Sequence, residues 1–278
     1  NNGTVGNSIA RYVDHDSAYD QISGQNNEDT AELRFTSNFD GPFNFLLAVY
    51  HLDYHDYNVQ YFVNNSGAFD YPGIILGPLL AADGTVLSPT QFNSNNQDYH
   101  LKSSAIFGEL YYNVTDDFKL TGGLRYTDDK KHFESKSIAL QSIQAIGSTT
   151  PPASNPNCAF AGAVCDANGF LLQSKTYKAW TGHAVATWTP KTDWSDQTTV
   201  YASYSRGYRS GGFNPPASVP GLFPTSFAPE KVDSFEVGTK NTFETGLGAV
   251  QANVTGWYYK YQGYQVSQII NRQSVNGN

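Results

Sequence analysis

Side-chain polarity alternates with a period of two along most of the chain, and this pattern limits the possible folds more than any other feature. In the segment 118–126, Phe118, Leu120 and Leu124 are apolar, whereas Lys119 and Arg125 between them are charged. Successive side chains of a β-strand point to opposite faces of its sheet, so this segment would present one apolar and one polar face. The alternation therefore predicts a strand here.

The same alternation recurs in seven further segments, which brings the predicted number of strands to about eight. Aromatic residues make up 14% of the chain and charged residues only 15%. This composition disfavours coiled coils, helical bundles and disordered chains, and no run approaches the about 18 apolar residues of a transmembrane helix. One segment, 43–54, is apolar on both faces in its first half, so its orientation stays open. The other six are 31–36, 103–114, 177–188, 198–205, 232–243 and 248–259.

The connections between these segments alternate between short and long. Short turns are expected at 37–42, 115–117, 190–196 and 244–246, and long loops at 58–99, 134–174 and 208–227. Outer-membrane barrels have tight turns on the periplasmic side and long loops outside. We therefore predict an all-β fold, an antiparallel up-and-down transmembrane β-barrel segment in the bacterial outer membrane.

A soluble secreted β-sandwich, such as a carbohydrate-binding module, is the main alternative fold. One face of a sandwich sheet is also apolar and the other polar, so alternation alone does not separate the two. The placement of every long loop at one end favours the barrel, because a sandwich has no reason for it. Tyr and Trp near the strand ends also favour the barrel, since aromatic girdles mark both membrane interfaces.

Five strings of this sequence resemble the barrel region of TonB-dependent outer-membrane receptors. The resemblance implies a barrel of about 22 strands around a plug domain. It also implies energised uptake of a scarce ligand, such as an iron chelate, cobalamin or an oligosaccharide. The strings are Glu32-Leu-Arg-Phe-Thr-Ser-Asn38, Ser104-Ala-Ile-Phe-Gly-Glu109, Leu120-Thr-Gly-Gly-Leu-Arg-Tyr126, Tyr201-Ala-Ser-Tyr-Ser-Arg-Gly-Tyr-Arg-Ser-Gly-Gly-Phe-Asn214 and Pro229-Glu-Lys-Val-Asp-Ser-Phe-Glu-Val-Gly-Thr-Lys240.

Residues 1–278 are expected to be part of a single TonB-dependent receptor β-barrel domain, about its middle third. The sequence contains no methionine, and neither a plug domain, a TonB box nor the terminal barrel strand is recognisable. The partners implied by the resemblance are outer-membrane lipid and lipopolysaccharide, the plug domain, the TonB complex and a small ligand, most often a ferric siderophore. A passive porin-like channel is the alternative function, and an upstream plug domain would separate the two.

Three acidic and imidazole side chains, His51, Asp53 and His55, alternate along one predicted strand and share a face. They are candidate ligands for a metal at the pore mouth, although adjacent members lie about 6.6 Å apart along a strand. Ordinary polar lining of the barrel is the alternative interpretation.

Aromatic and arginine residues form two candidate ligand sites. If the apolar face of their strand meets lipid, Trp257, Tyr259 and Tyr261 face the lumen, where rings stack on sugars or chelates. Arg206 and Arg209 flank a glycine-rich loop and could bind anionic chelates. For the arginines, contact with lipopolysaccharide phosphates or a rim salt bridge is the preferred interpretation.

The two cysteines, Cys158 and Cys165, lie close enough in sequence to close a small loop, which predicts a disulfide in an oxidising compartment. The net charge of −8 argues against nucleic acid as a partner. No nucleophile elbow, zinc-protease or phosphate-loop motif occurs. We therefore expect neither an enzyme nor a cofactor.

Overall fold

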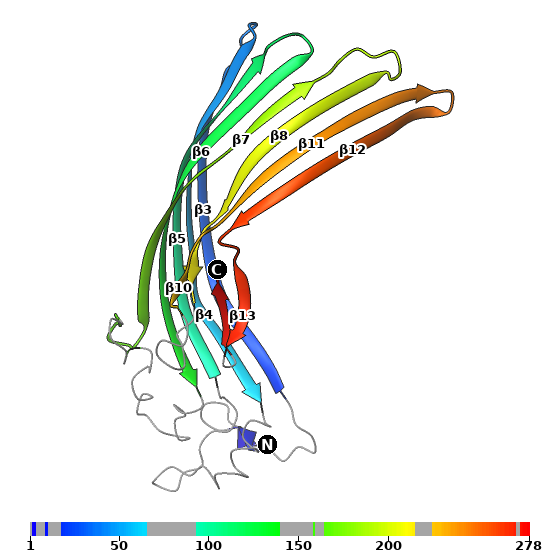
Figure 1. Ribbon diagram of the computed structural model, residues 1–278. Helices are drawn as coiled ribbons and strands as arrows, with labels where there is room; N and C mark the ends of the chain where they lie inside the picture. Colours follow the sequence, from blue (N-terminus) through cyan, green and yellow to red (C-terminus); the bar gives the residue numbers. More distant parts are fainter. Residues whose placement is uncertain are drawn as a thin grey trace.

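The computed structural model describes residues 2–3, 9–10, 18–65, 93–139, 158, 164–214, 224–270 and 273–278. Eight long antiparallel strands form one sheet, and three two-stranded ribbons accompany it (Figure 1). The long strands are β3 Ala18–Thr36, β4 Phe43–Asn65, β5 Asn93–Asn113, β6 Phe118–Ala139, β7 Leu171–Trp188, β8 Gln197–Arg209, β11 Glu230–Thr245 and β12 Gly248–Gln262. The ribbons are β1 Asn2–Gly3 with β2 Ile9–Ala10, β9 Gly212–Phe213 with β10 Ser226–Phe227, and β13 Val266–Ile270 with β14 Gln273–Gly277.

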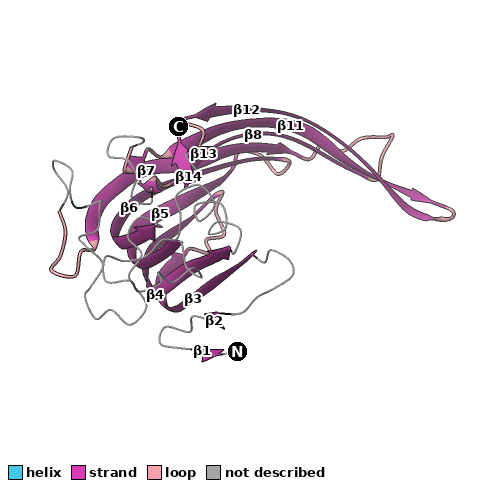
Figure 2. Ribbon diagram, turned by 90° about the horizontal axis from the view of Figure 1, so that it is seen from below, coloured by secondary structure: helices cyan, strands magenta, loops and turns pink. Residues whose placement is uncertain are grey.

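The sheet follows an up-and-down order, because every long strand pairs with its neighbour in the chain. It bends into an arc whose edges are β3 and β12, so the barrel is not closed (Figure 2). All short turns lie at one end of the strands, at the top of Figure 1, and the strand ends that the long connections join lie at the other. This arrangement confirms the predicted fold class, and the long connections mark the extracellular end.

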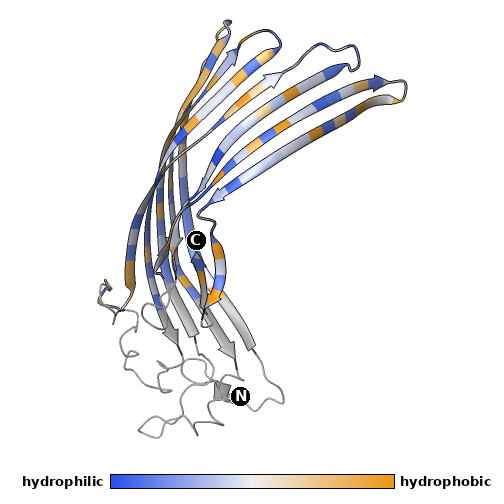
Figure 3. Cartoon of the chain, in the orientation of Figure 1, coloured by the Kyte–Doolittle hydropathy of each residue, from blue (hydrophilic) through white to orange (hydrophobic). Residues whose placement is uncertain are grey.

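One face of the arc carries rows of exposed apolar side chains. Cross-strand register places Leu33, Val49, Ile106, Tyr126 and Trp180 on the same face. Leu33 is 73% exposed and Trp180 is 58% exposed, which no soluble sandwich core would allow. In Figure 3, apolar and polar residues alternate along the strands toward the short turns. These rows therefore face lipid, and the sandwich interpretation is wrong.

The apolar rows end in register across β4 to β7, and again in register across β8, β11 and β12, there four residues closer to the short turns. The last lipid-facing residues before the extracellular half are Val49, Ile106, Tyr126, Trp180, Tyr204, Phe235 and Tyr258. We call them the upper row because they lie toward the extracellular side, although the extracellular half lies at the bottom of Figure 1. Two residues further on, the same face carries His51, Ser104, Asp128, Lys178, Arg206, Asp233 and Lys260. Charged side chains are costly within hydrocarbon, so the membrane ends at the upper row.

The opposite, concave face is more closely packed. Its buried side chains include Ala48, Ala105, Thr127 and Ala179, and the last three lie in register across β5, β6 and β7. Small residues allow side chains on neighbouring strands to cover one another on this inner wall. The concave face is therefore the lumenal side of the barrel wall.

The periplasmic turns are fixed by local hydrogen bonds. In the turn between β5 and β6, the Trp188 indole donates to Asp117 at 3.1 Å, and the Thr115 hydroxyl donates to the same carboxylate. These two bonds, the threonine's being the stronger, lower the pKa of Asp117 below its ordinary value. Gly248 has a φ of +125°, a conformation that favours glycine and tightens the turn between β11 and β12.

The strands extend further into the extracellular half than the sequence predicted. The predicted loop begins at residue 58, but β4 continues to Asn65, and β5 begins at Asn93. β3 likewise begins at Ala18, within a stretch of polar residues. Beyond the upper row both faces of the sheet contact water, so alternation of apolar and polar residues no longer indicates a strand. No helix in the described parts of the chain is long and apolar enough to cross a membrane.

Candidate functional site on the concave wall

The extracellular half of the concave wall is where a lumenal ligand would first meet the barrel.

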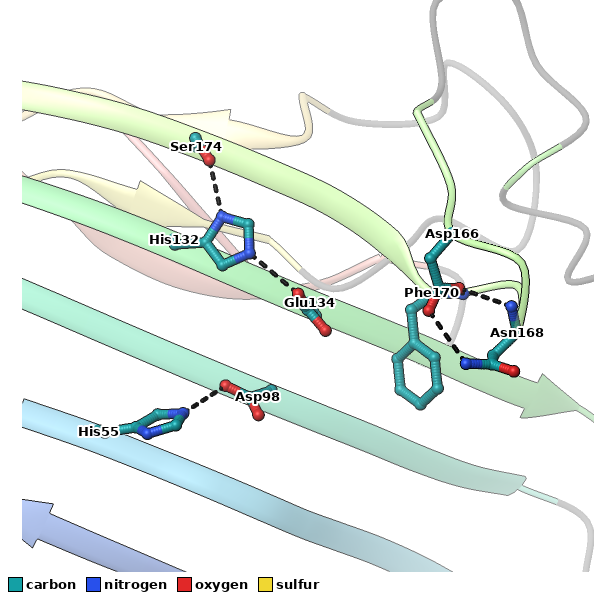
Figure 4. A network of polar contacts seen from close by, with 8 residues as sticks. All are labelled: His55, Asp98, His132, Glu134, Asp166, Asn168, Phe170 and Ser174. Atoms are coloured by element: carbon teal, nitrogen blue, oxygen red, sulfur yellow. Dashed lines mark hydrogen bonds and ion pairs between the residues drawn. The ribbon is translucent and has the colours of Figure 1, made fainter.

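The predicted metal ligands lie on the convex face, not at the pore mouth. His51, Asp53 and His55 continue the lipid-facing row of β4, so they lie on the outer side of the wall. Each has a separate partner: Ser104 at 2.9 Å for His51 and His100 at 2.6 Å for Asp53. His55 bonds Asp98 at 2.8 Å (Figure 4). Among the described residues no group of three such side chains could hold a metal ion. The structure therefore does not assemble this metal site.

Histidines continue across the same convex surface. His132 bonds Ser174 at 2.7 Å and Glu134 at 3.0 Å (Figure 4). On β4 and β5, the pKa of Asp53 is lowered, mainly by the hydrogen bond from His100 and further by the charge of Lys102. The alternation at 51–55 correctly predicts that these side chains share one face of the strand. The sequence alone does not decide whether that face is the lumenal or the outer one.

The two predicted arginines point to different sides of β8. Arg206 donates to both oxygens of Asp233, at 2.7 and 2.8 Å, on the lipid-facing side just beyond the upper row. Together with a bond from Tyr204, this pair holds the pKa of Asp233 at about 2. Arg209 lies on the opposite face and is exposed. Arg206 is therefore engaged in a salt bridge, and only Arg209 points toward the lumen.

The predicted aromatic platform lies on the concave face of β12. Trp257, Tyr259 and Tyr261 alternate with the lipid-facing Tyr258 and are 65%, 48% and 50% exposed. Trp257 is opposite Glu236 in register. Their contact with a ligand remains a prediction.

A further element on the concave wall was not predicted from the sequence. The segment after β8 turns inward, and its ribbon β9–β10 lies against β6 and β7. We call residues 211–214 with 224–227 the strap. Gln173 donates to the Thr225 carbonyl at 2.9 Å, and the rings of Phe133 and Phe213 stack with centroids 5.8 Å apart. Asn214, 1% exposed, ties the strap to β14 through Asn276.

Deeper in the wall, a cavity of about 340 Å³ opens on the concave face. Phe107, Glu109, Arg125, Thr181, His183 and Ser205 contribute side chains to its lining. His183 lies over Gly123 and reaches Glu109 at 3.2 Å. Arg125 lies over the rings of Tyr50 and Phe107, at 5.4 and 5.1 Å from their centroids. This group was not predicted from the sequence, where the only indication of it is the position of each member on the polar face of its strand.

Cys158 and Cys165 are joined by a disulfide in the structure, with Cα atoms 5.9 Å apart. The bridge precedes a turn in which Asp166 accepts bonds from the backbone of Asn168 and Phe170 (Figure 4). It stiffens the entry to β7 on the extracellular side.

An exposed apolar belt, a crowded polar lumenal wall and long connections at one end define the wall of an outer-membrane β-barrel. This class agrees with a family model. The model described as TonB dependent receptor-like, beta-barrel, matches residues 1–278, and the chain belongs to this family. Its location is therefore the bacterial outer membrane.

A solved structure shares the fold. The ferric yersiniabactin uptake receptor FyuA from Yersinia pestis superposes with a TM-score of 0.61 at 17% sequence identity. The match covers 90% of this chain and 31% of the receptor. The chain thus spans about a third of that receptor's length.

Proposed function

We propose that the intact protein is a TonB-energised receptor that imports a scarce ligand, most often a ferric siderophore in this class of receptor. This chain would supply part of its barrel wall. Members of the family are receptors and transporters rather than enzymes. FyuA, which shares the fold, is described as an uptake receptor for a ferric chelate.

The single observation that carries the proposal is the difference between the two faces of the sheet on the periplasmic side of the upper row. The convex face offers hydrocarbon-compatible side chains, whereas the concave face offers ionisable groups such as Glu109, Arg125 and His183. A plug domain would meet this wall from inside, and the TonB complex would act through the plug. Lipid and lipopolysaccharide would contact the convex face.

Uptake of iron-55 chelates by iron-starved cells tests the proposal. Cells that produce the intact receptor should accumulate a chelate of the correct class, and a protonophore or loss of TonB should abolish this uptake. Uptake that continues unchanged without energy would instead indicate the passive channel.

A further inference from the structure

Two lysines on the concave wall lie directly opposite each other. Lys131 of β6 pairs in register with Lys175 of β7, and like charges in such positions destabilise a sheet. In the described parts of the chain neither ammonium group forms an ion pair. Burial lowers the pKa of Lys131, and the charge of Arg209 lowers it further against the opposing effect of Asp129. This wall therefore holds positive charge at a cost in stability.

An aromatic ring lies between these charges. Both ammonium groups lie over the Tyr177 ring, each 5.6 Å from its centroid, and Tyr177 itself is 5% exposed. We call Lys131, Lys175 and Arg209 around Tyr177 the lysine patch. Two acids lie nearby but are engaged: Asp129 accepts from the Ser103 hydroxyl, and Glu230, opposite Arg209, accepts from the Gln265 backbone.

The strap places neutral oxygen atoms on the lysine patch. Lys131 donates to the Gly211 carbonyl at 2.5 Å, and Lys175 donates to the Ser226 hydroxyl at 3.1 Å. The Tyr177 hydroxyl lies 3.4 and 3.3 Å from the carbonyl oxygens of the two strap strands. A Cβ at Gly211 would come within 2.6 Å of the Tyr177 ring. Glycine is therefore needed for this close approach.

We propose that the lysine patch is a binding site for an anionic, oxygen-rich ligand, and that the strap occupies this site until the ligand displaces it. Carbonyl oxygens satisfy the donors without neutralising their charge, whereas carboxylate or catecholate oxygens would do both. The inference rests on the proposed import of a chelate and narrows that ligand to an anionic one.

Binding to the purified intact receptor tests the patch. The probes are an anionic ferric catecholate, ferric citrate, metal-free citrate and a cationic ferric hydroxamate. The double variant Lys131→Gln, Lys175→Gln should bind the anionic probes about tenfold more weakly or worse. Lys130→Gln is the control, because it removes one lysine charge from the exposed convex face, one residue away from Lys131. The double Lys→Arg variant should retain binding, which separates loss of charge from misfolding.

Variants that release the strap should have the opposite effect on anion binding. Gly211→Ala dislodges the strap, and Tyr177→Phe removes hydrogen bonds to it while keeping the ring, so both should tighten anion binding. Unchanged or weaker binding by both variants would refute the displacement.

The two proposals fail separately. If no ferric chelate is taken up by cells, the proposed function fails, but binding of metal-free citrate to the purified receptor still tests the lysine patch. Equal or absent citrate binding by the wild type and the double Lys→Gln variant overturns the patch, even where chelate uptake is normal.

Discussion

Replacement of Leu124 by arginine tests whether the convex rows face hydrocarbon. Leu124 lies on the lipid-facing side of β6 and is 58% exposed. Full burial of a leucine contributes about 1.5–3 kcal/mol, so this exposed fraction gains about 0.9–1.7 kcal/mol from lipid. An arginine costs ~2–4 kcal/mol at the midplane and less toward the interface, and Leu124 lies one lipid-facing position inside the upper row, so we take a further ~1–3 kcal/mol. Leu124→Arg should therefore destabilise the barrel by about 2–5 kcal/mol, roughly a 30- to 4,000-fold change in the folding equilibrium.

The assay is urea unfolding of the intact receptor in lipid vesicles, followed by heat-modifiable migration on a gel. Thr121→Arg is the control, because it places the same charge on the concave face of the same strand. The control should cost far less, since the lumenal side is polar. A soluble surface tolerates such changes within about 0.5 kcal/mol, so a neutral Leu124→Arg would refute the assignment of this face to lipid.

Three further changes probe single features of the wall. Thiol labelling of the unreduced, unfolded chain should be negative because Cys158 and Cys165 are bonded, and two reactive thiols would contradict the bridge. Gly182→Ala should destabilise by about 1–3 kcal/mol, because its Cβ would lie 2.5 Å from a backbone carbonyl of β6, whereas Gly256→Ala, with nothing within 4 Å, should be neutral in the same urea assay. The pKa of Asp233 is depressed to about 2 from 3.8, so its contribution to stability is present above pH 4 and is lost as the pH falls toward 2. Asp233→Asn should remove this dependence from urea midpoints measured against pH.

Period-two alternation was enough to predict the strands where one face meets lipid. Within the membrane, as at 118–126, one face of a strand contacts hydrocarbon and the other the aqueous lumen, so the polarity of a side chain indicates which way it points. At 51–55 the convex face is wet, and His51 could be assigned to the lumen or the exterior with equal logic. Continuity with Val49 decides for the exterior, and that continuity needed the register of the whole sheet.

The concave site depends on contacts that no local pattern encodes. Lys131 and Gly211 are 80 residues apart, and the strap reaches the wall only because the segment after β8 turns inward. The glycine pair at 211–212 is recognisable from the sequence only as part of a glycine-rich loop, yet Gly211 allows close packing against Tyr177. Side-chain spacing within one strand could not have indicated a partner from a distant loop.

The open edges of the sheet make a last prediction for the chain by itself. β12 is exposed along its whole length, and a membrane-crossing strand has about ten residues in hydrocarbon. Half of these present their backbone N–H and C=O groups to the open edge, which is about ten unpaired groups at several kcal/mol each. β3 doubles this penalty. Residues 1–278 produced alone should therefore aggregate and show no heat-modifiable form in detergent, whereas the intact receptor should show one. A folded, detergent-soluble monomer of the isolated chain would mean that the two edges can meet, and that the open arc is not the shape that the membrane selects.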